Sequence, residues 1–82
     1  MVYIMETSEI GERLAAERKR RKLTQARLAE LIGTNPQSVS NWENDRSRPS
    51  TGDLQAMGLL GFNVSFILLG KGRVDRKLQA TL

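Results

Sequence analysis

The chain has 82 residues, enough for one small domain, and 13 Lys and Arg against 9 Asp and Glu give it a net charge of +4. Cysteine and histidine are absent, which excludes disulfides, thiolate or imidazole metal sites and the common nucleophile–base pairs of enzymes. No apolar run approaches the roughly 18 residues of a membrane helix. We therefore expect a cytoplasmic protein with no catalytic residues, metal or cofactor.

Residues 1–7 form a short apolar leader that could be a strand, a cap on the core or a mobile end. Ser8 is the predicted N-cap of a first helix, which buries Ile10 and Leu14. This helix ends in the five-residue basic run RKRRK at residues 18–22. The run complements the dipole at a helix C-terminus, and it would also attract phosphate; the two interpretations are compatible.

The stretch from residue 24 to residue 43 predicts two short helices joined by a tight turn. Thr24 is the N-cap of the first helix, whose Leu28 and Ile32 are four residues apart and share a face. Gly33 follows the last apolar residue, where a left-handed conformation costs least without a Cβ. Asn35 and Pro36 then supply an N-cap and a first helical residue that needs no N–H.

The second helix of this pair leaves polar side chains on its outer face. Val39 and Trp42 are three residues apart and point inward; for Trp42, a core position is favoured over stacking on bases. The outward residues are Gln37, Ser40, Asn41 and Asn44. Such a face is often merely solvated, but amides and hydroxyls also pair well with base edges, and arginines flank this helix on both sides. We therefore expect the face to contact DNA.

The next segment, from residue 44 to residue 50, is a polar loop in which Arg46 and Arg48 are predicted phosphate contacts. Ser50 is the predicted cap of a fourth helix with an apolar stripe at Leu54, Met57 and Leu60. Two glycines make that helix intrinsically weak, so its persistence must come from packing.

A fifth helix, capped by Asn63, crowds apolar residues into about two turns. A short helix cannot bury all of them within its own domain, which predicts a homodimer interface; burial beneath the leader is the alternative. The predicted interface residues are Val64, Phe66, Ile67, Leu68 and Leu69. Residues 71–82 form a polar tail of mixed charge, either disordered or a short extra helix.

In its ordered set of residues the chain resembles the DNA-binding domain of the Cro/C1-type (XRE) phage repressor family. The shared features run from Thr24-Gln25 through Leu28-Ala29, Ile32-Gly33, Ser38-Val39-Ser40 and Trp42-Glu43 to RPS at 48–50 and LGFNVSFILLG at 60–70. The resemblance covers roughly residues 8–70. It implies an all-α, five-helix lambda-repressor-like domain that contains a helix-turn-helix, with the second helix of the motif in the major groove.

The resemblance also implies roles for single residues. Gln37 and Asn41, with Ser40, are the expected base readers, and an Arg18–Glu43 ion pair ties the first helix to the end of the recognition helix. The expected contacts to the DNA backbone or an outer base are Gln25, Arg27, Asn35, Ser38, Asn44, Arg46 and Arg48.

The chain departs from the family pattern at two positions. Pro36 stands where relatives often carry a polar base reader, and it leaves only van der Waals contact there. Arg27 replaces a capping-box Glu, opposes the helix dipole and would be stabilised by a nearby phosphate.

The function expected from these features is sequence-specific binding to double-stranded DNA, as a phage or prophage-type repressor acting as a homodimer on a near-palindromic operator. The alternative is an antitoxin-like module that grips another protein through the fifth helix and tail and uses its DNA surface for autoregulation. An enzyme is disfavoured because no acid–base or nucleophile constellation is present.

Overall fold

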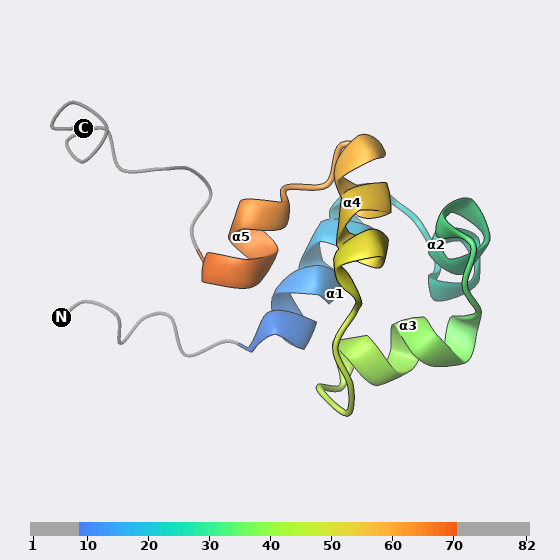
Figure 1. Cartoon of the computed structure of the whole chain (residues 1–82), viewed down its shortest axis with the longest axis horizontal. Coiled ribbons are helices and arrows are strands. Elements are labelled where there is room, and N and C mark those ends of the chain that lie inside the picture. The colour runs from blue at the N-terminus through green and yellow to red at the C-terminus, as the bar shows by residue number, and fades with distance from the viewer. Residues whose placement is uncertain (1–8, 71–82) are drawn as a thin grey trace, which may run out of the picture.

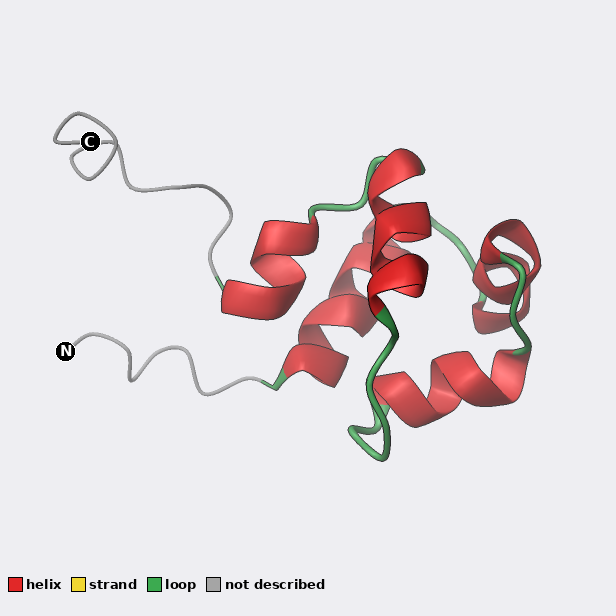
Figure 2. Ribbon diagram, viewed as in Figure 1, coloured by secondary structure: helices red, strands yellow, loops and turns green. Residues whose placement is uncertain are grey.

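The computed structural model describes residues 9–70, and all regular secondary structure in that range is helical (Figures 1 and 2). The helices are α1 (Ile10–Arg20), α2 (Gln25–Ile32), α3 (Pro36–Glu43), α4 (Thr51–Leu59) and α5 (Val64–Leu69). The predicted all-α, five-helix architecture is confirmed. The leader at 1–7, Ser8 and the tail at 71–82 lie outside the described residues. None of the five helices is long and apolar enough to cross a membrane.

Four helices begin at the caps that the sequence predicts. The Thr24 hydroxyl accepts a hydrogen bond from the backbone of the third residue of α2 at 3.0 Å. Asn35 and Asn63 do the same for α3 and α5, at 2.8 Å and 3.0 Å. Ser50 forms a reciprocal capping box with Asp53. Each cap satisfies a backbone N–H that the helix leaves without a partner, so local sequence fixes where these helices start.

The start of α1 differs from the prediction. Its N-cap is Glu9, whose side chain makes no capping hydrogen bond. The Gly11 N–H is instead satisfied by Asp45 Oδ1, at 3.0 Å, from the loop after α3. A Cβ on Gly11 would lie 2.4 Å from the Trp42 carbonyl oxygen. The N-terminus of α1 therefore packs directly on the backbone at the C-terminus of α3, which only a glycine permits.

The core is built by side chains from every helix, with α1 packed against α3 and α5, and α2 packed against α3 and α4. All five helices contribute fully buried side chains, which include Leu14, Leu28, Val39, Met57 and Ile67. Phe62, in the loop before α5, packs beside them at 5% exposure. Trp42 is also 5% exposed, so the prediction that it is a core residue is confirmed. Leu60 was predicted to complete the stripe of α4 but is 37% exposed. It is the C-cap residue that follows the last residue of α4, so it lies outside the helical stripe.

Two buried charged side chains of α1 hydrogen-bond to the backbone at the two ends of α5. Arg13 donates from Nε to the Ile67 carbonyl at 3.0 Å and from a terminal nitrogen to the Leu68 carbonyl at 3.3 Å. Glu17 accepts from the Asn63 N–H at 2.8 Å. The positive group thus lies at the C-terminus of α5 and the negative group at its N-terminus, as the helix dipole favours. This arrangement makes α5 antiparallel to α1.

The outer side of α5 corrects one predicted interface residue. Ile67 is fully buried among core residues, so it cannot contact a second molecule. It faces α1 because its helical position points inward, whereas Leu68 and Leu69 are 41% and 68% exposed. Val64 and Phe66 are half-buried. α5 therefore contributes Ile67 to the core and leaves the apolar residues Leu68 and Leu69 exposed at its C-terminal end.

Candidate nucleic-acid interface

α2 and α3 form a helix-turn-helix around one left-handed glycine. Gly33 has φ +79°, and the following Thr34 N–H returns to the Ala29 carbonyl at 2.9 Å. The turn brings the buried side chains Leu28 and Ala29 of α2 against the inward side chains of α3. The bend thus holds α3 at a fixed angle on the domain surface, with its other face free (Figure 1).

The free face of α3 carries the amides that the sequence singled out. Gln37 is exposed, and its Nε2 donates to Asn41 Oδ1 at 3.1 Å, one turn along. Ser40 and Asn41 are half-buried, while Val39 and Trp42 point into the core. The side-chain oxygen of Gln37, Oε1, and the Asn41 Nδ2 group make no hydrogen bond within residues 9–70. The pair therefore offers an acceptor and donors side by side, as base edges require.

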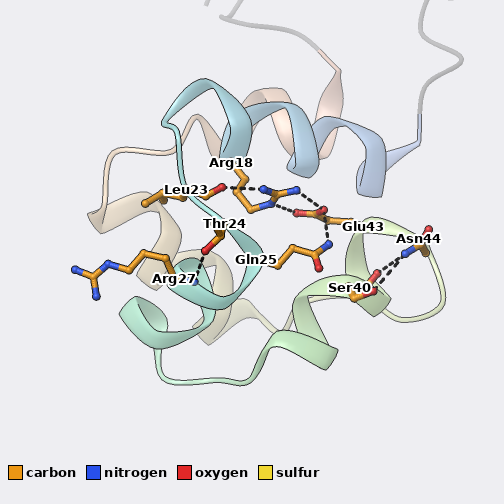
Figure 3. Close-up of polar contacts among 8 residues, drawn as sticks. All are labelled: Arg18, Leu23, Thr24, Gln25, Arg27, Ser40, Glu43 and Asn44. Carbon is orange, nitrogen blue, oxygen red and sulfur yellow. Dashed lines mark hydrogen bonds and ion pairs between the residues drawn. The ribbon is translucent and has the colours of Figure 1, made fainter.

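Glu43 anchors the C-terminal end of α3 by accepting hydrogen bonds from side chains of α1 and α2 (Figure 3). Arg18 donates to it in a two-bonded ion pair, from Nε to Oε2 at 2.6 Å and from a terminal nitrogen to Oε1 at 3.0 Å. A third Arg18 nitrogen reaches the Leu23 carbonyl at 2.8 Å. The hydrogen bond to Glu43 raises the pKa of Arg18, against the opposing effect of burial. The ion pair implied by the resemblance is thus present.

Gln25 and Asn44, two expected DNA contacts, are already engaged within the domain. Gln25 Nε2 donates to Glu43 Oε1 at 2.9 Å and is half-buried. Asn44 Nδ2 donates to the Ser40 carbonyl at 2.8 Å, which closes the last turn of α3 (Figure 3). The Asn44 Nδ2 group also lies 3.5 Å from Ser40 Oγ. An amide nitrogen carries two hydrogens, so Gln25 retains one donor for a phosphate, whereas both contacts of Asn44 are to Ser40.

The three arginines predicted to contact phosphate differ in their partners. Arg27 pairs with Glu30 at 2.8 Å, and Arg48 pairs with Asp45 at 3.0 Å. Arg46 is exposed, and no ion pair within residues 9–70 includes it. Two of the three positive charges therefore lie beside an acidic group on the same surface.

The arginines of the basic run at the end of α1 are engaged within the domain. Arg20 donates to Glu17 at 2.6 Å, and Arg21 donates to the Gly61 carbonyl and lies over the Phe62 ring, 5.2 Å from its centre. The Arg20 pair lies within α1, whereas the Arg21 contacts join α1 to the segment before α5. Lys19 and Lys22 are exposed. Attraction of phosphate by this run would therefore depend mainly on the lysines.

Sequence reasoning missed several residues that shape this surface. Asp45 caps α1 and pairs with Arg48, and Glu30 pairs with Arg27. Both ion pairs have the i, i+3 spacing of neighbours on a helical turn, a signal readable in the sequence. Within residues 9–70 no group of three or more acidic side chains is placed to hold a metal ion.

The chain is similar to known phage repressors. A family model described as helix-turn-helix matches residues 14–58. The immunity repressor protein of Bacillus phage phi105 is 43% identical over 72 residues, covering 87% of this chain and 49% of that protein. Repressor protein C2 of Salmonella phage P22 is 36% identical over 53 residues, covering 65% of this chain and 24% of that protein. The chain thus spans about half the length of the first relative and a quarter of the second.

A solved structure shares the fold. It is the P22 c2 repressor protein in complex with synthetic operator 9T in the presence of Tl+, with a TM-score of 0.72 and 32% sequence identity. The match covers 79% of this chain and all of that one.

Proposed function

The chain belongs to the Cro/C1-type helix-turn-helix family, and from this membership and the geometry of α3 we propose that it is a sequence-specific, double-stranded DNA-binding regulator of the phage or prophage repressor type. The two relatives described above are named repressors, and the similar solved structure is of a repressor with its operator. These names do not favour the antitoxin alternative. The expected action is occlusion of, or recruitment at, a promoter.

The observation that carries the proposal is the outer face of α3. Gln37 and Asn41 lie one turn apart, bonded to each other and directed away from the core. In this family the recognition helix enters the major groove with its N-terminal residues on base edges. Gln37 lies in the first turn of α3, so we assign it the leading role in base reading, with Asn41 and Ser40 beside it.

The second group of contacts would position the protein without reading sequence. We assign Arg46, Arg48 and Arg27 to phosphates, because guanidinium groups pair with phosphate oxygens regardless of base. The remaining polar residues at the ends of α2 and α3 would add amide and hydroxyl bonds to the DNA backbone: Gln25, Asn35, Ser38 and Asn44. At the start of α3 the Asn35 cap takes the Ser38 and Val39 N–H groups, which leaves the Gln37 N–H, together with the helix dipole, to favour a phosphate.

We also propose that the functional form is a homodimer joined through α5. Its exposed leucines, Leu68 and Leu69, with the half-buried Val64 and Phe66, form an apolar surface at the end of the domain. A two-fold pair would present two recognition helices to half-sites about one duplex turn apart, which is the arrangement that a near-palindromic operator requires.

A salt series of binding titrations tests the division of roles. The parent, Gln37→Ala and Arg46→Ala would be titrated on a duplex selected from a random pool and on unselected duplexes. We expect Gln37→Ala to lose about 1–3 kcal/mol on the selected duplex only. Arg46→Ala should weaken binding to every duplex and lower the salt slope by about 1. Equal losses by both variants on all duplexes would contradict the assignment.

A further inference from the structure

Pro36 is an exposed apolar residue at the first position of α3, and the proposed function does not use it. The preceding Asn35 directs its side-chain oxygen to the Ser38 N–H at 2.8 Å, which completes the helix cap. The next residue, Gln37, engages Asn41. In the first turn of the recognition helix, the pyrrolidine ring is thus an apolar group exposed among polar neighbours.

The ring is also held in a fixed position. Its φ is restricted by the ring itself, and the helix that it begins is packed down by Val39 and Trp42, which are 0% and 5% exposed. Proline loses almost no side-chain entropy when another group covers it. An exposed apolar group that is already immobile favours contact with an apolar partner at little further cost.

Base edges in the major groove offer one such partner. Guanine, adenine and cytosine present acceptors and amino groups, and thymine alone adds a C5 methyl group. Proline has no N–H, so a polar edge beneath the ring would lose hydrogen bonds to water without replacement. A methyl group in the same place would instead gain from burial. The gain from burying a methyl group and the cost of covering a polar edge thus both favour thymine beneath the ring.

Resting on the proposed function, we propose that Pro36 reads a thymine in each half-site by packing its ring against the C5 methyl group. The family places residues of this turn on base edges, and this chain carries an apolar ring there. Pro36 is thus a specificity-determining residue that acts by shape and apolar contact, beside the amide pair Gln37 and Asn41. Base readout would be divided between one methyl contact and the hydrogen bonds of the amides.

Replacing thymine by uracil tests this inference, since uracil lacks only the C5 methyl group. Each thymine of a duplex selected by the parent protein would be replaced in turn, and dissociation constants measured at one salt concentration. For the parent we expect one position per half-site at which uracil weakens binding about fourfold, as removal of one buried methyl group predicts. In Pro36→Ser, thymine and uracil at that position should bind equally well.

Gln37→Ala is the matched control, because it alters the neighbouring residue and should keep the uracil effect at the Pro36 position. Thermal unfolding of Pro36→Ser, followed by Trp42 fluorescence, checks that α3 is intact. No uracil-sensitive thymine, or the same sensitivity in Pro36→Ser, would overturn the inference while leaving the regulator function standing. Failure of the parent to prefer any selected duplex would instead refute the proposed function.

Discussion

α3 and α5 are both short helices that pack on α1 and begin at an asparagine cap, yet they expose opposite kinds of surface. The outer side of α3 carries the amides of Gln37 and Asn41, whereas the end of α5 exposes Leu68 and Leu69. In both helices the inward positions are apolar. The comparison teaches that the scaffold fixes only the inner face, so that each outer face is available for a different kind of partner.

The two helices are also anchored differently. α3 is held by a side-chain ion pair from Arg18 to Glu43 at 2.6 Å, whereas α5 is held by Arg13 and Glu17 acting on its backbone. Backbone anchoring tolerates change in the anchored helix, because every residue supplies a carbonyl and an N–H. Side-chain anchoring depends on one residue. Substitutions at the α3 anchor should therefore have the largest effects.

Glu43→Ala should cause the greatest loss. It leaves the Arg18 charge buried without its carboxylate, which costs about 3–4 kcal/mol of unfolding free energy. Urea unfolding followed by Trp42 fluorescence measures it. Glu30→Ala removes an exposed carboxylate paired with Arg27 at 2.8 Å and should cost less than about 1 kcal/mol. Similar losses in the two variants would contradict the anchoring role of Glu43.

Gly11→Ala tests the close approach of α1 to α3. The added Cβ would meet the carbonyl oxygens of Trp42 and Glu43 at 2.4 Å and 2.5 Å, and we expect a loss of about 2–3 kcal/mol in unfolding free energy. Gly52→Ala is the matched control in α4, where the nearest atom lies 3.7 Å away. It should stabilise the protein by about 0.5–1 kcal/mol. Thermal unfolding compares them, and the same sign in both would refute the packing argument.

Leu69→Lys tests the apolar end of α5. Leu69 is 68% exposed, so the folded monomer should keep its stability, while self-association should weaken about tenfold by loss of apolar burial and by charge repulsion. Sedimentation equilibrium gives the association constant. Leu59→Lys, at a residue of α4 that is 83% exposed and outside the proposed interface, should leave it unchanged. If Leu59→Lys were the damaging change, the interface would lie on α4.

Asp45→Asn should have the smallest effect, and we expect it to tighten binding. Asparagine keeps an oxygen for the Gly11 N–H and tolerates the φ of +58° at this position. It removes the charge that pairs with Arg48 at 3.0 Å, so every duplex should bind about threefold more tightly. Binding titrations at low salt test this, and a gain confined to one sequence would contradict it.

The sequence was sufficient wherever a rule acts within a few residues. Thr24, Asn35, Ser50 and Asn63 are caps because each is followed by a backbone N–H that needs an acceptor, and Gly33 is the residue that fits a left-handed turn. The fold and its helix-turn-helix follow from these starts and from apolar spacing. The ion pair of Arg18 needed the family resemblance, since its partner is 25 residues away.

Contacts set by packing could not be read from the chain. The burial of Arg13 and Glu17 depends on which helix lies opposite α1, and nothing local indicates that α5 is antiparallel to it. The same applies to the cap that Asp45 supplies across 34 residues. Ile67 was predicted at an interface because periodicity does not show how many of five adjacent apolar residues a neighbouring helix will cover.

The antiparallel course of α5 brings the two boundaries of the described chain together. Arg13, in the second turn of α1, hydrogen-bonds the Leu68 carbonyl at 3.3 Å, so Glu9 and Gly70 emerge at the same end of the bundle. A short flexible peptide could therefore close residues 9–70 into a ring without disturbing any helix. Such a cyclic domain would have fewer unfolded conformations and should melt at a higher temperature than its linear counterpart.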